Sequence, residues 1–546
     1  MKSEFKTQFG ENIFRYKYAQ GPADTWAKLA ERLVEDVCGS RENTVAKLMP
    51  DDERKQLVQY IREFKFIPGG RYLYYAGRPY KAYNNCYLLR AEEDTREEWS
   101  NVTWRAMSCL MTGGGIGVDY SRLREQGSAL KRTGGTASGP IPLMYAINEI
   151  GRNVMQGGSR RSAIYASLNW KHPDINLFLR AKNWTELTKE QKLLDFNYPA
   201  SLDMTNISVN FDDASLVGGL ENNEIFKATC RQALETGEPG FSFNFGDKQN
   251  ETLRNACTEV TSEDDSDVCN LGSINIGNID SIKEFEHIVQ LASKFLVCGT
   301  LRADLPYDKV YRVREKNRRL GLGLMGIHEW LLKRGQKYEV TDELHSWLKV
   351  YKDQSELAAN EHCDRFYISR PIAYRAIAPT GSIGILAGTT TGIEPLFAVA
   401  YKRRFLTEGT KWKYQYVVDG TAATLISEYG VQPNEIDTAL DLSSNYEQRL
   451  KFQADVQDYV DMSISSTINL PSWGSRGNDK QNVESFTNTL AKYAPRLRGF
   501  TCYPDGSRGG QPLTSVPYEE ALKHKDVVYD EVDICEITGH GGSCGV

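Results

Sequence analysis

Leu110-Met-Thr-Gly-Gly-Gly-Ile-Gly-Val-Asp-Tyr120 decides the fold, because in it a glycine cluster leads directly into a short apolar run. The same pattern begins at Phe66-Ile-Pro-Gly-Gly-Arg-Tyr-Leu-Tyr-Tyr75 and returns over residues 132–144 and 155–168. Short apolar runs are typical of buried strands, and glycines between them are typical of tight turns. Strands that alternate with helices and are joined by glycine turns indicate an α/β domain.

The regions on either side of this pattern differ from it. Residues 23–38 and 51–65 carry apolar side chains at helical spacing, which predicts a short N-terminal helical region over residues 1–62. The α/β domain is expected over 63–512. Residues 513–546 should hold a late helix opened by Pro517 and, beyond Asp526, a flexible tail that is first acidic and then glycine-rich.

Composition excludes several classes of protein. The chain has 546 residues, 40% of them hydrophobic, so it can bury a large core. Its net charge of -6 gives no basic footprint for nucleic acid and no polybasic membrane patch. Neither an apolar run of eighteen residues nor a signal peptide occurs, so we expect a cytoplasmic protein.

Eleven cysteines are spread over the chain. A reducing cytosol keeps thiols reduced, which argues against a framework of structural disulfides. Free cysteines usually serve as small buried apolar residues. That is the interpretation for Cys38, Cys109, Cys230, Cys298 and Cys363.

The segment Asn255-Ala-Cys257-Thr-Glu259 places an amide, a thiol and a carboxylate at alternate positions. In an extended strand the three side chains would point to one side, where the amide could hold a hydroxyl and the carboxylate could accept its proton. The alternative interpretation is a turn with a buried cysteine.

Four more cysteines are candidates for redox chemistry. Cys86 and Cys269 could form a pair if their Cβ atoms came within about 4 Å. Cys535 and Cys544 lie in the predicted tail near His540, which is too few ligands for a structural zinc site, so no metal site is predicted there. A mobile dithiol with a reach of roughly 20–25 Å is the preferred interpretation of this tail pair.

Three glycine clusters could bind phosphate through backbone N–H groups: residues 113–117, 134–139 and 379–384. None has the Gly-Lys-Ser/Thr ending of a Walker A loop, and a glycine cluster by itself is more often a plain tight turn. Arg160 and Arg161, which follow Gly157-Gly158, add charge that could pair with a phosphate.

Twelve segments in order resemble one family, the ribonucleotide reductases, and more closely its adenosylcobalamin-dependent class II. They run from about Phe66 to Gly510. The segments are FIPGGRYLYYAG, NNCYLL, LMTGGGIGVDYSRL, GGTASGPIPLM, GGSRRSAIYASL, TNISVNF, ETGEPGFSF, NACTEV, CNLGSIN, EKNRRLGLGLMGIHEWL, APTGSIGILAGTTTGIEP and YPDGSRGGQP.

The resemblance implies a ten-stranded α/β barrel with a central finger loop and a radical mechanism for making deoxyribonucleotides. Cys257 would carry the thiyl radical, Glu259 would exchange the proton of the 3′-hydroxyl, and Asn255 would hydrogen-bond the sugar. Cys86 and Cys269 would be the redox-active pair that ends as a disulfide. The commoner form of the motif in the family is Asn-Pro-Cys-Gly-Glu, but the three side chains that the chemistry needs are kept.

The same resemblance implies partners and further sites. Cys535 and Cys544 would re-reduce the disulfide and then be restored by thioredoxin or glutaredoxin, with Cys502 as an alternative member of this pair. A deoxynucleoside triphosphate effector would bind near two loops. The residues implied for these loops are Gly134, Gly135, Thr136, Arg160 and Arg161, and those implied for the substrate phosphates are Ser201, Asn206, Ser208, Thr380, Gly381 and Ser382.

The source of the radical separates two hypotheses. Class I catalytic subunits take it from a metal-radical partner through two adjacent tyrosines, whereas Thr501-Cys502-Tyr503-Pro504 has one, which favours adenosylcobalamin.

No ATP-cone is expected. Only residues 118–133 lie where monomeric class II enzymes carry a long insertion, so we expect a homodimer. A remote alternative, a catalytically inactive nucleotide-binding regulator, disagrees with the intact motif residues.

Overall fold

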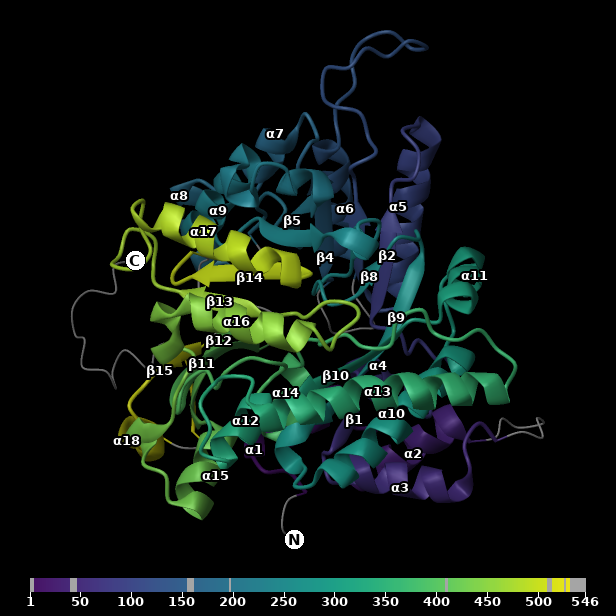
Figure 1. Cartoon of the computed structure of the whole chain (residues 1–546), viewed down its shortest axis with the longest axis vertical. Coiled ribbons are helices and arrows are strands. Elements are labelled where there is room, and N and C mark those ends of the chain that lie inside the picture. The colour runs from purple at the N-terminus through teal and green to yellow at the C-terminus, as the bar shows by residue number, and fades with distance from the viewer. Residues whose placement is uncertain are drawn as a thin grey trace.

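The apolar runs at 116–118 and 164–168 form strands, whereas the runs after Gly69-Gly70 and Gly139 form helices. Five strands of the main sheet lie next to one another and run parallel (Figure 1). They are β2 (Cys86–Arg90), β3 (Gly115–Asp119), β4 (Ile164–Asn169), β5 (Thr205–Asp212) and β6 (Gly240–Asn244). The computed structural model describes residues 4–39, 47–154, 162–195, 198–407, 411–507, 513–524 and 527–530.

Further strands extend this sheet on both sides to ten. Next to β2 lies the antiparallel β9 (Asp267–Asn275), which pairs with β10 (Leu320–Met325) and β1 (Phe66–Pro68). Next to β6 lies the antiparallel β14 (Gly499–Pro504), which runs parallel to β13 (Thr467–Leu470).

The two ends of the sheet are joined by an extended segment, 373–377. The N–H of Leu320 on β10 donates to the Ala373 carbonyl at 2.9 Å. The N–H of Ile377 donates to the Ser463 carbonyl at 3.2 Å, just before β13. Hydrogen bonds therefore connect the strands into a ring, and the prediction of a mixed α/β fold with ten strands is confirmed.

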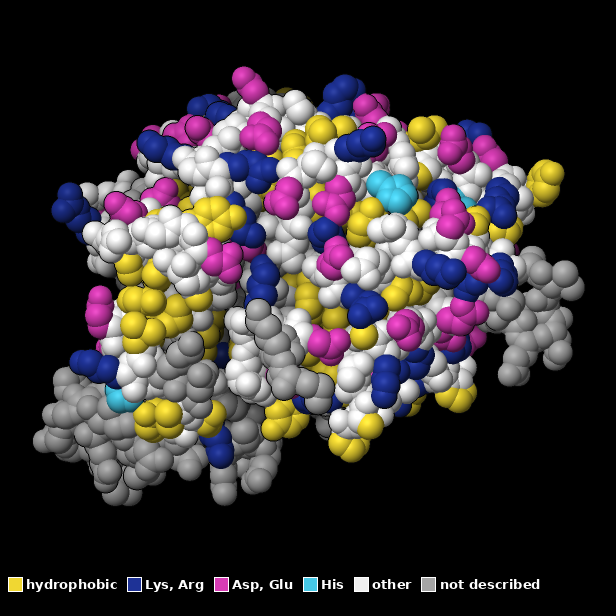
Figure 2. All heavy atoms as spheres, turned by 90° about the horizontal axis from the view of Figure 1, so that it is seen from below, with side chains coloured by type: hydrophobic (Ala, Val, Ile, Leu, Met, Phe, Trp, Pro, Cys, Tyr) yellow, Lys and Arg dark blue, Asp and Glu magenta, His cyan; other side chains and the backbone are white. Residues whose placement is uncertain are grey.

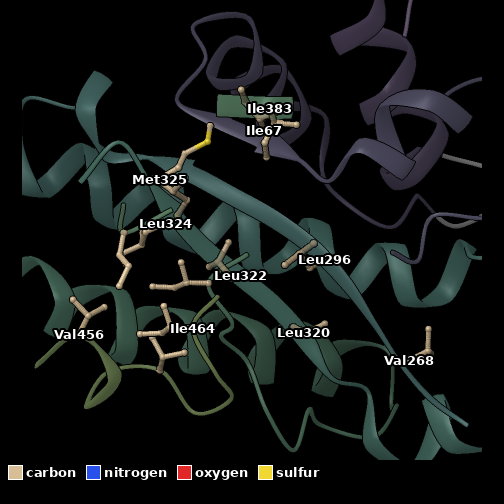
Figure 3. Packing of buried hydrophobic residues seen from close by; sticks show 14 of the residues in the cluster. Ile67, Val268, Leu296, Leu320, Leu322, Leu324, Met325, Ile383, Val456 and Ile464 are labelled. Atoms are coloured by element: carbon tan, nitrogen blue, oxygen red, sulfur yellow. The ribbon is translucent and has the colours of Figure 1, made fainter. Parts of the chain in front are cut away.

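Helices cover the outside of the strands, as parallel sheets require, since both of their faces are apolar. One layer, below the sheet in Figure 1, contains α2 (Trp26–Cys38), α3 (Asp51–Arg62), α10 (Ile282–Arg302) and α13 (Asp342–Arg365). The other main helices are α5 (Arg96–Met111), α6 (Ile141–Asn153), α9 (Glu224–Thr236), α16 (Tyr446–Gln457) and α17 (Asn482–Tyr493). Figure 3 shows the core between them, where Leu320, Leu322 and Leu324 of β10 lie among buried side chains of neighbouring elements.

The shorter elements complete the fold. The helices are α1 (Gln8–Lys17), α4 (Gly70–Tyr75), α7 (Ile175–Leu179), α8 (Glu186–Leu194), α11 (Asp308–Asn317), α12 (Ile327–Lys333), α14 (Gly381–Ala387), α15 (Gly420–Tyr429) and α18 (Tyr518–Lys523). A hairpin of β7 (Leu253–Arg254) and β8 (Thr261–Ser262) stands apart from the sheets. The expected helices near residues 23–38, 51–65 and 517–524 are confirmed by α2, α3 and α18.

A second sheet corrects part of the prediction for the C-terminal region. It contains four strands in the order β15 (Leu513–Ser515), β11 (Ala400–Thr407), β12 (Lys411–Val418) and β16 (Val528–Asp530). The expectation of a tail from Asp526 onward is therefore wrong for Val528–Asp530, because backbone pairing with β12 holds these residues in a strand.

The N-terminal helix α1 lies directly against the ring. A Cβ atom on Gly10 would come within 2.8 Å of the Leu386 carbonyl oxygen at the end of α14, so only glycine allows this approach. Basic and acidic side chains are interspersed on the face shown in Figure 2. No helix in the described ranges is long and apolar enough to cross a membrane.

Candidate active site

The β7–β8 hairpin carries the motif with Cys257 at its tip. The Thr258 N–H donates to the Asn255 carbonyl at 3.0 Å, which closes a tight turn, and Thr258 has a φ of 70°. The prediction of an extended strand here is therefore wrong, and the alternative of a turn is correct. The turn differs from that alternative in one respect, since the Cys257 side chain is exposed.

The hairpin crosses the inside of the ring. On one side Asn255 Nδ2 donates to Cys86 Sγ on β2 at 2.9 Å. On the other side the N–H of Ser463, in the chain leading to β13, donates to the Glu259 carbonyl at 2.8 Å. Bonds to opposite parts of the ring place this hairpin at its centre, as the finger loop of the resemblance requires.

Glycines on β3 make room for the hairpin. A Cβ atom on Gly117 would lie 1.7 Å from the Arg254 carbonyl oxygen, and one on Gly115 would lie 3.0 Å from Ala256 Cβ. Real Cβ atoms do not come as close as the first value. The cluster 113–117, a candidate phosphate loop in the sequence, thus has a packing function in the structure.

Cys86 and Cys269 face each other. They are directly opposite residues of the antiparallel strands β2 and β9. Such residues have Cβ atoms about 4.5–5.5 Å apart and side chains on the same face of the sheet. Both thiols are buried. A small approach of the two Cβ atoms would bring them within the range of a disulfide.

Burial controls the protonation of this group. Burial raises the pKa of Glu259 to about 7, although hydrogen bonds from Asn255, its own backbone and the Cys86 thiol oppose the shift. Burial also raises the pKa of Cys86, and the nearby Glu259 carboxyl adds to the effect. Burial and Asp267 raise the pKa of Cys269. Near neutral pH the two thiols therefore stay protonated while Glu259 exchanges a proton readily.

A cleft of about 130 Å³ opens onto the β7–β8 hairpin, and we call it the active-site cleft. Thr380, Gly381 and Ser382, at the start of α14, line it together with Cys257 and Glu259. The Lys17 ammonium donates to Ser382 Oγ at 3.1 Å. The other motif residues that line the cleft are Cys86 and Asn255, and Tyr18 and Arg71 complete part of its wall.

Sequence reasoning missed Lys17, Tyr18 and Arg71 as site residues. Arg71 lies in a segment that carried the resemblance, but without a role. Lys17 and Tyr18 come from the N-terminal helical region, and their approach to α14, more than 350 positions away, leaves no local signal in the sequence.

Other predicted residues lie elsewhere. Ser201 Oγ donates to the Ala181 carbonyl, Asn206 and Ser208 are on β5, and none of the three lines the active-site cleft. Cys502 is buried in β14, where its thiol donates to the Ala233 carbonyl at 3.6 Å. The predicted residues Arg160, Arg161, Cys535 and Cys544 are outside the described residues.

Two further clefts lie near predicted features. The first, which we call the Thr136 cleft, is lined by Thr136 together with Arg96 and Arg124. Gly134 and Gly135 lie beside it, at the exposed tip of a separate turn over residues 127–137. The second, the tryptophan cleft, has a volume of about 620 Å³. Its lining includes Trp184, Trp473 and the residues 504–507 that follow β14.

The fold and the site together define a class of protein in which a thiol-bearing hairpin stands inside a ring of strands, opposite two facing cysteines. The sequence matches the family described as "Ribonucleotide reductase, barrel domain" over residues 84–214, 207–346 and 370–494. These segments make up most of the chain, which therefore belongs to the ribonucleotide reductase family.

Three relatives align with most of the chain. A "Vitamin B12-dependent ribonucleoside-diphosphate reductase" of Mycobacterium tuberculosis (strain CDC 1551 / Oshkosh) is 26% identical over 93% of this chain and 80% of its own. A protein of the same name from Thermoplasma acidophilum is 27% identical over 84% and 66%. A "Putative adenosylcobalamin-dependent ribonucleoside-triphosphate reductase" of Mycobacterium phage D29 is 24% identical over 94% and 95%.

Replacing Gly117 by alanine should displace the hairpin, because the new methyl group would overlap the Arg254 carbonyl. We expect the variant to lose at least tenfold in turnover and to show an altered rate of Cys257 alkylation, measured by mass spectrometry. Val118→Ala, in the same strand, removes atoms without adding an overlap and serves as the control. Wild-type turnover and Cys257 reactivity in Gly117→Ala would contradict the packing argument.

Proposed function

We propose that this chain reduces ribonucleotides to 2′-deoxyribonucleotides, the precursors of DNA, through a thiyl radical on Cys257. One observation carries the proposal: the exposed thiol of Cys257 lies in the same cleft as Glu259, Asn255 and the buried Cys86, which faces Cys269. Membership of the family and the names of the three relatives support the same conclusion.

Each side chain has one task in this mechanism. The Cys257 radical removes the hydrogen atom from the 3′ carbon of the ribose, and the Glu259 carboxylate takes the proton of the 3′-hydroxyl. Asn255 orients the sugar through its amide. Cys86 and Cys269 supply two electrons and two protons, so that the 2′-hydroxyl leaves as water and the two sulfurs form a disulfide. The radical at the 3′ carbon then takes the hydrogen atom back from the Cys257 thiol, which regenerates the thiyl radical.

A reductant must reopen that disulfide after every turnover. Because Cys86 and Cys269 are buried, a protein such as thioredoxin or glutaredoxin needs a carrier to reach them. We propose Cys535 and Cys544 as the carrier dithiol.

The cofactor we propose is adenosylcobalamin, which supplies the initial radical when it is bound. The names of the three relatives support it. The residues of the tryptophan cleft fit such a group, because the faces of Trp184 and Trp473 suit a large, partly apolar ring system, while Asn183, Ser472 and Ser507 offer hydrogen bonds to its amides. The alternative is a separate metal-radical subunit of the class I kind.

An activity assay separates these possibilities. We expect deoxynucleotide formation from this chain with adenosylcobalamin, a dithiol and an effector, and none from Cys257→Ser. Quenching of Trp184 and Trp473 fluorescence on titration with cobalamin gives a second readout, to be compared with Trp184→Phe and Trp473→Phe. Activity that appears only with an added metal-radical subunit would support the class I alternative, and no product in either case would refute the proposed function.

The role of Glu259 makes a prediction about pH. The carboxyl must be ionised to accept a proton, and burial raises its pKa to about 7, so turnover should rise as the pH passes through about 7 from below. Glu259→Gln should reduce kcat by about 10²–10⁴-fold and abolish this step. Asp419, whose pKa burial raises to about 6 outside the site, provides a control as Asp419→Asn. A flat profile for the wild-type enzyme between pH 6 and 8 would contradict the assignment.

The substrate phosphates are proposed to bind at Thr380, Gly381 and Ser382, with Lys17 as a cationic partner. Hydrogen bonds to charged groups contribute about 1.5–3 kcal/mol, so Lys17→Gln should raise KM by about tenfold or more and leave kcat nearly unchanged. Lys17→Arg should keep most of the affinity, and Lys28→Gln, on an exposed face of α2, should behave as wild type. An unchanged KM in Lys17→Gln would exclude the contact.

The effector and the dimer are proposed at neighbouring surfaces. The Thr136 cleft, with the cations Arg96 and Arg124, is the proposed site for a deoxynucleoside triphosphate. Arg96 begins α5, and the same helix exposes Trp104, Met107 and Met111 at helical spacing. This apolar stripe is the proposed contact with a second copy of the chain, so that effector and partner would meet on one helix.

A further inference from the structure

Two more thiols meet a histidine where three helices of one layer come together. Cys38 is the last residue of α2, Cys298 lies in α10 and His362 lies in α13, and all three are buried. Cys298 Sγ lies 3.3 Å from His362 Nε2. Cys298 Sγ also lies 3.9 Å from the Leu48 carbonyl oxygen, and the Leu48 N–H donates to the Cys38 carbonyl at 3.0 Å, so Cys38 and Cys298 meet at the same backbone segment. The sequence had suggested only plain apolar roles for both cysteines.

The pKa values of the two thiols are shifted in opposite directions. Burial raises the pKa of Cys298, but hydrogen bonds from Cys38 and His362 outweigh it and bring the value to about 6. Burial raises the pKa of Cys38, and the neighbouring Cys298 raises it further. By contrast, burial raises the pKa of Cys109, whose hydrogen bond is to Tyr307. A thiolate beside a thiol is the arrangement from which a disulfide forms.

The pair lies behind the catalytic cysteines without joining the active-site cleft. Asn270, which follows Cys269, donates through Nδ2 to Tyr72 Oη at 2.6 Å and to the Leu296 carbonyl of α10 at 2.8 Å. A Cβ atom on Gly299, next to Cys298, would overlap Tyr72 Oη. Neither Cys38 nor Cys298 lines the active-site cleft, so Tyr72 and Asn270 separate the two thiol pairs.

We propose that Cys38 and Cys298 are a second redox site, which forms a reversible disulfide when the protein meets hydrogen peroxide. The Cys298 thiolate attacks the peroxide and becomes a sulfenic acid, with release of hydroxide. The Cys38 thiol then displaces water from that sulfur and forms the S–S bond. In total two thiols and one hydrogen peroxide give one disulfide and two waters, and a dithiol reverses the change.

The disulfide would tie the N-terminal helix α2 to α10 of the barrel. A bond between positions 38 and 298 closes a very long loop and therefore restricts the unfolded chain strongly. The oxidised form should resist thermal unfolding better than the reduced form. This inference concerns a site outside the catalytic machinery and does not depend on the proposed function.

The test uses the full chain in a Cys269→Ser background, so that the catalytic pair cannot form its own disulfide. The reduced protein is treated with hydrogen peroxide, alkylated and digested without reductant, and cross-linked peptides are identified by mass spectrometry. We expect a Cys38–Cys298 peptide that dithiothreitol removes, together with a higher Tm. Cys38→Ser should lose both effects, and Cys109→Ser, which removes an unrelated buried thiol, should keep both.

His362 acts through Cys298 and is a positioning residue in this scheme. His362→Gln should slow formation of the cross-link by about tenfold or more, because less of Cys298 is thiolate at neutral pH. Recovery of Cys38 and Cys298 as free alkylated thiols after peroxide treatment, in protein that keeps its fold, would overturn the proposal. An unchanged cross-linking rate in His362→Gln would overturn the role of the Cys–His contact. Both the cross-link and the Tm shift are measured in Cys269→Ser protein that keeps Cys38 and Cys298, so the main result does not rely on the folding of Cys38→Ser or Cys109→Ser.

Discussion

The close approach of one carbonyl to one glycine fixes the centre of this molecule. The Arg254 carbonyl occupies the space where any side chain at Gly117 would begin, so the hairpin lies directly on β3. From that position Asn255 reaches Cys86 on β2, and the Glu259 backbone meets Ser463 on the other side of the ring. A larger residue at Gly117 would disturb all of these contacts together.

The site combines an exposed thiol with buried acid–base groups. Cys257 is accessible at the tip of the hairpin, whereas Glu259 and Cys86 are shielded from water a few residues away. Burial raises the pKa of both buried groups, so protons remain available near neutral pH. The thiol of Cys298 behaves differently, because the neighbouring Cys38 and His362 together outweigh the effect of burial on its pKa.

Much of the fold and the centre of the site could be predicted from the sequence, because glycine clusters and apolar runs are local signals. Cys86, Cys269, Asn255 and Glu259 were identified from short motifs. The turn at Cys257 was not, because the β-branched Thr258 favours extended backbone and only contacts within the ring bend it. The contact between Lys17 and Ser382 and the pairing of β16 depend on residues far apart in the sequence and could not be predicted locally.

Thr258 holds a strained backbone conformation at the tip of the β7–β8 hairpin. A non-glycine residue in the left-handed region costs roughly 1–2 kcal/mol, and Thr258 adopts this conformation beside Cys257. The turn is therefore strained, and contacts with the surrounding residues, such as Gly499 of β14 near Thr258 Oγ1, keep it in this conformation. The strands around the hairpin thus determine the position of Cys257. A substitution in one of these strands, even far from Cys257 in the sequence, would therefore move its thiol.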